Sequence, residues 1–242
     1  MTSEKEQELR EVNQVFYDSL WSSAKLIGPE RFNTWPLVES LAAQAPNRLE
    51  VGPGLRPRLP VEGTHFVDIS PPALTLLEQA GGKTFNSSID ELPFENGTFE
   101  LVCALDIIEH VENDRGALSE ITRVAASGAT VLLSTPLHPE YWTPFDEFVG
   151  HYRRYEPERL SELLAKNGLS VEQSGIFGMK PKSSRLVDVG MWFLTHRRKR
   201  AMWWYNNVFM PMGLRFQKPL ALSDGMVPTD GVDEVFLVCR KA

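Results

Sequence analysis

Composition and charge set the first limits on this chain. It has 242 residues, 42% hydrophobic content, a net charge of −7 and a pI near 5.3. These values fit one large domain with a sizeable core. They argue against a general nucleic-acid-binding surface, so we expect a small-molecule partner.

The cysteines and the apolar runs indicate the cellular setting. The two cysteines, Cys103 and Cys239, lie inside apolar runs. We therefore expect no disulfide framework. We expect a reducing, cytoplasmic setting instead. The N-terminus is charged and helical rather than an apolar signal, and no run reaches the roughly 18 apolar residues of a membrane span.

The chain begins with a helical region. Apolar residues recur at helical spacing from Val12 to Leu20 and again from Leu37 to Ala42. We therefore expect residues 1–45 to form two helices that cover a sheet.

Short apolar runs of strand type follow, and helical segments separate most of them. This alternation predicts an α/β protein with a mostly parallel sheet and helices on both faces, whose ligand binds at the carboxyl ends of the strands. The expected helices are "PPALTLLEQA", "DRGALSEITRVAAS" and "EPERLSELLAKNG". The expected strands are residues 49–52, 65–69, 99–105, 130–134, 170–176 and 234–239.

A long insertion separates the last two expected strands. The strand after it can pair antiparallel with residues 170–176 at the sheet edge. We divide the single expected domain into four parts. They are an N-terminal helical cover (1–45), a cofactor-binding core (46–177), a helical insertion (178–232) and the last strand (233–242).

A glycine pair follows the first expected strand, in "RLEVGPGLRPRLPVEGTHFVDIS". Gly52 and Gly54 allow a sharp turn and a close approach to a ligand, and Glu50 places a carboxylate at the end of the strand. A dinucleotide site requires a third glycine and a helix N-terminus under the pyrophosphate. Arg56 takes the third position, and only about a dozen residues remain before the next strand, too few for a full crossover helix.

A ligand that carries an ammonium and a sulfonium group suits this loop better than a diphosphate. Glu50 would receive the cationic groups, and Arg56 could face a carboxylate of the same ligand. Asp68 ends the second strand, where its carboxylate could hold a ribose diol. S-adenosylmethionine carries all of these groups. The glycine pair taken alone has a second interpretation, because it is also typical of an ordinary tight turn.

From Glu50 to about Leu169 the chain resembles the class I S-adenosylmethionine-dependent methyltransferases, in the methyltransferase type 11 group around the ubiquinone-biosynthesis enzymes. The resemblance rests on "EVGPG", "VDIS", "SSIDELPFENGTFELVCALDIIEHVEND", "ALSEITRVAASGATVLLSTP" and "GHYRRYEPERLSELLAKNGL", which occur in this order. It implies a Rossmann-like sheet of seven strands, six parallel and one antiparallel. It also implies methyl transfer from S-adenosylmethionine to a small-molecule acceptor.

The resemblance further implies which residues surround the cofactor. The glycine loop would line the methionine part, Asp68 the ribose and Ile69 the adenine. The family usually has an aspartate four residues before the leucine of "LPF", to meet the adenine amino group; Ser88 stands there, and Asp90 is an alternative. The full expected set is Glu50, Gly52, Pro53, Gly54, Arg56, Asp68, Ile69, Ser88, Ile89, Asp90 and Leu105.

The segment "ALDIIEHVEND" leaves the fourth strand at its carboxyl end. A helical turn there would bring Asp106, Glu109 and His110 to one mouth, and the family's fold would return His151 over the same site. We expect His110 and His151 to be the catalytic residues, one of them as the base for an oxygen acceptor. His151 could instead cap the helix that follows it.

A divalent metal at the same place is the alternative. Some relatives bind a metal through an acid-x-x-Glu-His run and a later histidine, and Asp106, Glu109, His110 and His151 resemble that layout. Carboxylates and imidazoles suit such an ion, which could polarise an acceptor hydroxyl. Many members read "EHV" without a metal, so a metal is not expected.

The insertion contains aromatic residues around a basic run, in "VGMWFLTHRRKRAMWWYNNVFMPMGLRF". We expect a cap in which Trp192, Trp203, Trp204 and Phe209 bury an apolar or aromatic acceptor. Two alternatives stay open, a helical pair packed on the body or on a second subunit, and membrane-surface contact through residues 186–216. The oligomeric state is left undecided.

Two other functions compete with methyl transfer. A non-catalytic nucleotide-sensing or scaffolding protein would keep the same fold, and Ser88 with the short loop favours it. Glu50, Asp68 and the polar "DIIEH" segment favour an enzyme. A nicotinamide-dependent oxidoreductase would need the missing glycine and a longer helix.

Overall fold

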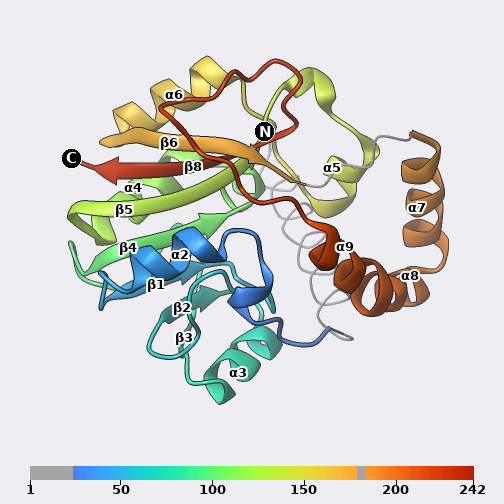
Figure 1. Ribbon diagram of the computed structural model, residues 1–242, viewed down its shortest axis with the longest axis horizontal. Helices are drawn as coiled ribbons and strands as arrows, with labels where there is room; N and C mark the ends of the chain where they lie inside the picture. Colours follow the sequence, from blue (N-terminus) through green and yellow to red (C-terminus); the bar gives the residue numbers. More distant parts are fainter. Residues whose placement is uncertain (1–23, 179–183) are drawn as a thin grey trace.

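A computed structural model describes residues 24–178 and 184–242. The first expected helix, within residues 1–23, lies outside this part of the chain. The described residues form an α/β fold in which helices lie on both faces of a central sheet (Figure 1).

Eight strands form the sheet within the described residues. Their bounds are Arg48–Val51 (β1), His65–Asp68 (β2), Lys83–Asn86 (β3), Phe99–Leu105 (β4), Ala125–Pro136 (β5), Leu169–Phe177 (β6), Ser223–Asp224 (β7) and Glu234–Lys241 (β8). The order across the sheet is β3-β2-β1-β4-β5-β8-β6-β7 (Figure 1). β1 to β5 pair in parallel, and β8 pairs antiparallel with both β5 and β6. β6 therefore has the direction of β5, so six strands run parallel as expected, but two strands, β7 and β8, run antiparallel to them instead of the single one expected.

The structure differs from the expected elements in several details, among them β3, which was not expected from the apolar pattern. β7 is an additional strand that pairs with β6 through two residues. β8 pairs with β6 as expected but lies between β5 and β6, because its run Val235–Cys239 is buried throughout, as in a central strand. The helix expected to reach Ser127 ends at Val124, and Ala125 already pairs with Phe99.

Helices cover both faces of the sheet. On one face, α2 buries Val38 and Ala42 against Leu101 of β4 and Phe236 of β8, which confirms the expected cover by residues 37–42. On the other face, α4 and α6 complete a larger core. The helix bounds are Trp35–Ala42 (α2), Pro71–Gln79 (α3), Asp114–Val124 (α4), Pro144–Val149 (α5), Pro157–Lys166 (α6), Ser184–His196 (α7), Arg198–Trp204 (α8) and Met210–Phe216 (α9). Shorter turns are Pro29–Arg31 (η1), Ile108–His110 (η2), Pro139–Tyr141 (η3) and Tyr205–Phe209 (η4, a π-helical turn).

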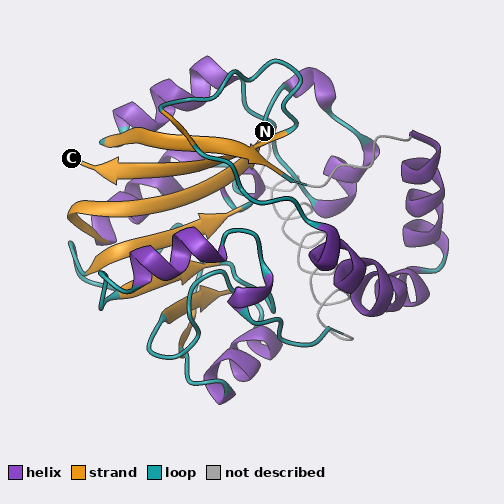
Figure 2. Cartoon of the chain, in the orientation of Figure 1, coloured by secondary structure: helices purple, strands orange, loops and turns teal. Residues whose placement is uncertain are grey.

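The insertion forms an arm beyond the carboxyl ends of the parallel strands (Figures 1 and 2). We define the arm as residues 184–218, which contain α7, α8, η4 and α9. Met202 of α8 is buried against Leu55, and Met210 and Leu214 of α9 are buried against Phe32. The arm therefore packs on the loop that follows β1 and on the segment before α2.

Candidate cofactor site and active site

The glycine loop after β1 has the backbone conformation that the sequence predicts. Gly52 has φ of 67° and Gly54 has φ of 53°, both in the left-handed region that favours glycine. A Cβ at Gly52 would lie 2.2 Å from Cδ1 of Ile107. The glycine loop therefore contacts the segment that follows β4, so the expected cofactor site and the expected catalytic segment lie next to each other.

Glu50 is buried and is held by the loop itself. Its carboxylate accepts hydrogen bonds from the backbone N–H of Arg58, at 2.9 and 3.0 Å, and of Leu59, at 2.9 Å. These two donors stand between Pro57 and Pro60, which prevent the helix that would otherwise use them. Burial raises the pKa of Glu50 to about 7.

Asp68 lies beside the same loop, at the end of β2. One carboxylate oxygen accepts from the backbone N–H of Gly54 at 2.9 Å and the other from Ser70 at 2.8 Å. Burial raises its pKa, and these hydrogen bonds oppose the shift. The carboxylate joins the ends of β1 and β2, which is where the ribose of a nucleotide lies in Rossmann-like folds.

The two arginines of the loop point to different places. Arg56, which we expected to face a carboxylate, donates to Tyr205 Oη at 3.3 Å and to Asn206 Oδ1 at 3.2 Å. It therefore contacts the arm, and its role toward the cofactor stays a prediction.

Arg58 was not singled out from the sequence. Its guanidinium carbon lies 3.7 Å from the ring centroid of Phe32, which is cation–π geometry. Burial lowers its pKa, and the nearby carboxylates of Asp106 and Glu50 oppose this. Within the described part of the chain its guanidinium donates no hydrogen bond, so all its donors can serve a ligand. Arg58 lies two residues after Arg56, the arginine that the sequence predicts for the cofactor carboxylate. Only the three-dimensional structure shows which of the two arginines has free donors.

The residues expected around the adenine vary in exposure. Ile69 is 49% exposed beside Asp68, and Ser88 donates from its hydroxyl to Asp90 at 3.2 Å. Ile89 is instead buried in the core. Pro53 is buried within the glycine loop, and Leu105 packs against the cluster under α2. The contacts of these residues with a cofactor stay predictions.

The segment after β4 forms the 3₁₀ turn η2 rather than an α-helical turn. Asp106 has φ of 54° and lies outside the turn, where its carboxylate accepts from Ser134 Oγ at 2.6 Å. Glu109 is buried, and burial and the charge of Asp106 raise its pKa well above the ordinary value. Burial, and then the charge of His151, hold the pKa of His110 well below its ordinary value, so its imidazole is neutral.

His151 meets His110 as the sequence predicts. The two rings pack edge to face with centroids 4.5 Å apart. Nδ1 of His151 lies 2.9 Å from Oδ1 of Asp146, so an N–H at Nδ1 donates to this carboxylate and Nε2 carries the free lone pair. The structure does not support His151 as a cap of α6, which has Glu156 at its N-cap.

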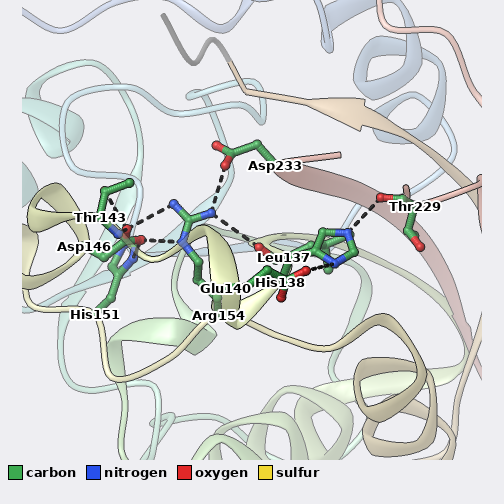
Figure 3. Close-up of polar contacts among 9 residues, drawn as sticks. All are labelled: Leu137, His138, Glu140, Thr143, Asp146, His151, Arg154, Thr229 and Asp233. Carbon is green, nitrogen blue, oxygen red and sulfur yellow. Dashed lines mark hydrogen bonds and ion pairs between the residues drawn. The ribbon is translucent and has the colours of Figure 1, made fainter. Parts of the chain in front are cut away.

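Asp146 is the second residue that sequence reasoning missed. It is fully buried and accepts hydrogen bonds from His151, Thr143 and Arg154 (Figure 3). Burial alone would raise its pKa, but these hydrogen bonds lower it below the ordinary value. Arg154 also pairs with Asp233 at 2.9 Å, so it joins α5 to the start of β8. The five-residue interval from Asp146 to His151 is the only sequence signal, and it is weak.

Three of the four residues of the alternative metal layout converge. Glu109, His110 and His151 can each offer a ligand atom within 4.8 Å of the others, whereas Asp106 does not join them. The donor set would suit a divalent cation. The same three residues can also form a polar cluster without a metal ion, because the hydrogen bond to Asp146 already orients His151.

These features define a class of protein. A Rossmann-like sheet with an antiparallel strand beside β5, a glycine loop after β1 and an acid at the end of β2 are features of the methyltransferase type of nucleotide-binding fold.

Comparisons with known proteins agree. The family described as "Methyltransferase domain" matches residues 55–133. A protein of Mycolicibacterium smegmatis, described as a probable S-adenosylmethionine-dependent methyltransferase, is 32% identical over 97 residues. That match covers 38% of this chain and 37% of the relative, so the chain spans well under two thirds of the relative's length.

Two solved structures share the fold. A S-adenosylmethionine-dependent methyltransferase of Thermotoga maritima has a TM-score of 0.57 at 15% identity, covering 97% of this chain and 98% of that one. An O-methyltransferase of Brevibacillus brevis, solved with S-adenosylhomocysteine, has a TM-score of 0.56 at 18% identity, covering 88% and 72%. Residues 55–133 thus match a methyltransferase domain, and the fold is that of the class I S-adenosylmethionine-dependent methyltransferases, the class whose cofactor is S-adenosylmethionine.

Proposed function

We propose that this protein transfers the methyl group of S-adenosylmethionine to a hydroxyl group of a small, largely apolar or aromatic acceptor. The observation that carries the proposal is the buried Asp146–His151 pair, 2.9 Å between Oδ1 and Nδ1, next to His110. An imidazole oriented in this way can accept at Nε2 the proton that a hydroxyl acceptor loses when it is methylated.

The proposed cofactor site lies along the ends of β1 and β2. Asp68 would hold the ribose, and Glu50 would attract the ammonium group of the methionine part. We assign the carboxylate of that part to Arg58, because its guanidinium has free donors and lies near Glu50. Arg58 thus takes the role that the sequence suggested for Arg56.

The chemistry then needs orientation and proton removal. The sulfonium is already activated, so the protein has to align the acceptor oxygen with the methyl group and exclude water. His151 would remove the hydroxyl proton through Nε2, and Asp146 would stabilise the imidazolium that forms. The neutral state of His110 helps, because a charged imidazole would repel the sulfonium.

We propose that the arm covers the site at the carboxyl ends of the parallel strands. Support comes from Met202, which is buried against Leu55 of the glycine loop, and from the contacts of Arg56 with Tyr205 and Asn206. The four aromatic residues expected to line a cap are about half-exposed, with Trp192 at 52% and Phe209 at 56%. The buried contacts of the arm with the body are therefore made by Met202, Met210 and Leu214, and the four aromatic side chains keep about half of their surface open.

The test combines binding with transfer. Wild type should bind S-adenosylhomocysteine and transfer labelled methyl from S-adenosylmethionine to a component of a cell extract. His151→Ala and Asp146→Asn should keep binding but lower transfer by about 10²–10⁴-fold, whereas the exposed His196→Ala should change neither.

The alternative is a non-catalytic sensor of the cofactor, because a fold alone does not establish a function. It predicts that the wild-type protein binds S-adenosylhomocysteine but transfers no labelled methyl group to any component of the extract. His151→Ala would then show the same absence of transfer as wild type. Equal transfer by wild type and His151→Ala would reject the proposed base and leave the binding site intact.

A further inference from the structure

The outward side of the arm is an apolar surface within a basic segment. Eight large apolar side chains are exposed there, and none belongs to the proposed catalytic site. Phe216 is 74% exposed and Phe209 is 56% exposed. The full set is Trp192, Phe193, Trp203, Trp204, Tyr205, Phe209, Met212 and Phe216.

The spacing places part of this surface on one side. Phe209, Met212 and Phe216 follow one another at intervals of three and four residues, which aligns them along α9 and the residue before it, whereas Tyr205 contacts Arg56 of the glycine loop. Met210 and Leu214 lie between them in the sequence and are buried against the body. The segment therefore has two apolar sides, and the outer one has no partner among the described residues.

The charge of the arm is opposite to that of the rest of the protein. Residues 184–218 contain seven lysines and arginines and one aspartate, a net charge of +6 in a chain of net charge −7. The remainder of the chain therefore carries −13. Arg198 stacks on Phe148 of the body, but Arg197, Lys199 and Arg200 are exposed.

We infer that the arm docks the protein on the surface of an anionic lipid bilayer. Exposed tryptophan and phenylalanine beside lysine and arginine is the composition of interfacial helices, whose aromatic rings enter the headgroup region while the cations meet anionic headgroups. A second copy of this chain fits less well, because two arms brought together would place their cations against each other. No helix among the described residues is long and apolar enough to span a bilayer, so the contact would be peripheral.

This inference gives the proposed reaction a source of acceptor. The same arm packs on the glycine loop with its inner side, so docking would bring the site close to the membrane. A lipid or lipid-linked hydroxyl compound would then be the apolar acceptor. This extension rests on the proposed function, whereas the docking itself does not.

The experiment is cosedimentation of the full-length protein with vesicles, without cofactor. The probes are vesicles of phosphatidylcholine alone and of phosphatidylcholine mixed with phosphatidylglycerol. We expect binding to the mixed vesicles that weakens with salt. Phe209→Ser with Phe216→Ser, and Lys199→Glu with Arg200→Glu, should each weaken it at least about tenfold.

Matched controls lie outside the arm. Leu76→Ser with Ile176→Ser replaces exposed apolar residues, and Lys83→Glu with Lys166→Glu makes the same charge change elsewhere. Failure of wild type to bind the mixed vesicles overturns the inference, as does equal weakening by the control variants. Light scattering that shows a dimer of wild type and a monomer of Phe209→Ser/Phe216→Ser would assign the surface to self-association and also overturn it. Loss of vesicle binding leaves binding of S-adenosylhomocysteine unaffected, so the two proposals fail separately.

Discussion

Gly52 lies where the glycine loop packs against Ile107 of the segment after β4, and this close packing is possible because glycine has no Cβ. Gly52→Ala would place a Cβ 2.2 Å from Ile107 and hold alanine at φ of 67°, so we expect unfolding free energy to fall by about 3 kcal/mol and cofactor binding to be lost. Gly128→Ala is the matched control, because Gly128 has φ of 73° but nothing within 4 Å of its would-be Cβ. It should cost only about 1 kcal/mol, and equal losses by chemical denaturation would contradict the predicted contact.

Glu50 makes cofactor binding depend on pH. With a pKa of about 7, it is largely neutral at pH 6 and ionised at pH 8. Only the ionised form attracts an ammonium group, so the affinity for S-adenosylhomocysteine should rise about tenfold over this interval. Calorimetry on Glu50→Gln should show weaker binding with a flatter pH profile, while the exposed Glu78→Gln keeps the wild-type profile. An unchanged profile in Glu50→Gln would reject the ammonium role.

Arg58 is tested with a ligand that lacks the amino-acid tail. Arg58→Gln should weaken S-adenosylhomocysteine about tenfold or more, because it removes a charge-assisted pair with the ligand carboxylate. It should leave 5′-methylthioadenosine unaffected. Arg56→Gln, which alters a neighbouring arginine directed at the arm, should change neither affinity. If Arg56→Gln shows the selective loss and Arg58→Gln does not, the original sequence assignment is right.

The short helix α5 depends on one ion-pair network for its position. It has six residues, too few to be stable alone, and Arg154 joins its buried Asp146 to Asp233. Arg154→Met leaves the Asp146 carboxylate without its main cation, and we expect a loss of about 3 kcal/mol with faster hydrogen exchange over residues 144–151. Lys166→Met, which breaks an exposed pair with Glu162, should cost under about 1 kcal/mol. Similar losses from both would contradict the structural role of the network.

The elements that the sequence predicted well share a strong apolar pattern. α2 and the strands β1, β2, β4 and β6 have runs that match their burial. β3 was not recognised, since Lys83–Asn86 is only partly buried, and β7 has two exposed residues. The place of β8 between β5 and β6 depends on pairing between distant segments, which local pattern does not encode.

The site was predictable where a motif fixes both residue and backbone. Gly52, Gly54 and the meeting of His110 with His151 are as predicted. Arg58 and Asp146 were missed, because their roles come from a loop held by prolines and from a buried ion pair, neither of which leaves a periodic signal. The role of the exposed aromatic residues of the arm stays a prediction for a related reason. Composition identifies an apolar segment but does not say which side faces the body.

The whole molecule has an acidic α/β body with the site at the strand ends and a basic arm over it (Figure 1). This arrangement gives the arm two neighbours, the glycine loop on its inner side and, by our inference, a membrane on its outer side. The account of the site nevertheless depends on one point, that the loop after β1 receives S-adenosylmethionine rather than a dinucleotide.

Calorimetric titration of the wild-type protein with S-adenosylhomocysteine and with NAD tests this point directly. The short loop closed by prolines and the carboxylate of Glu50 should favour the first ligand and exclude the second. We predict one-to-one binding of S-adenosylhomocysteine at micromolar or lower concentration and no heat with NAD. Binding of NAD, or no binding of S-adenosylhomocysteine by the folded protein, would contradict the account.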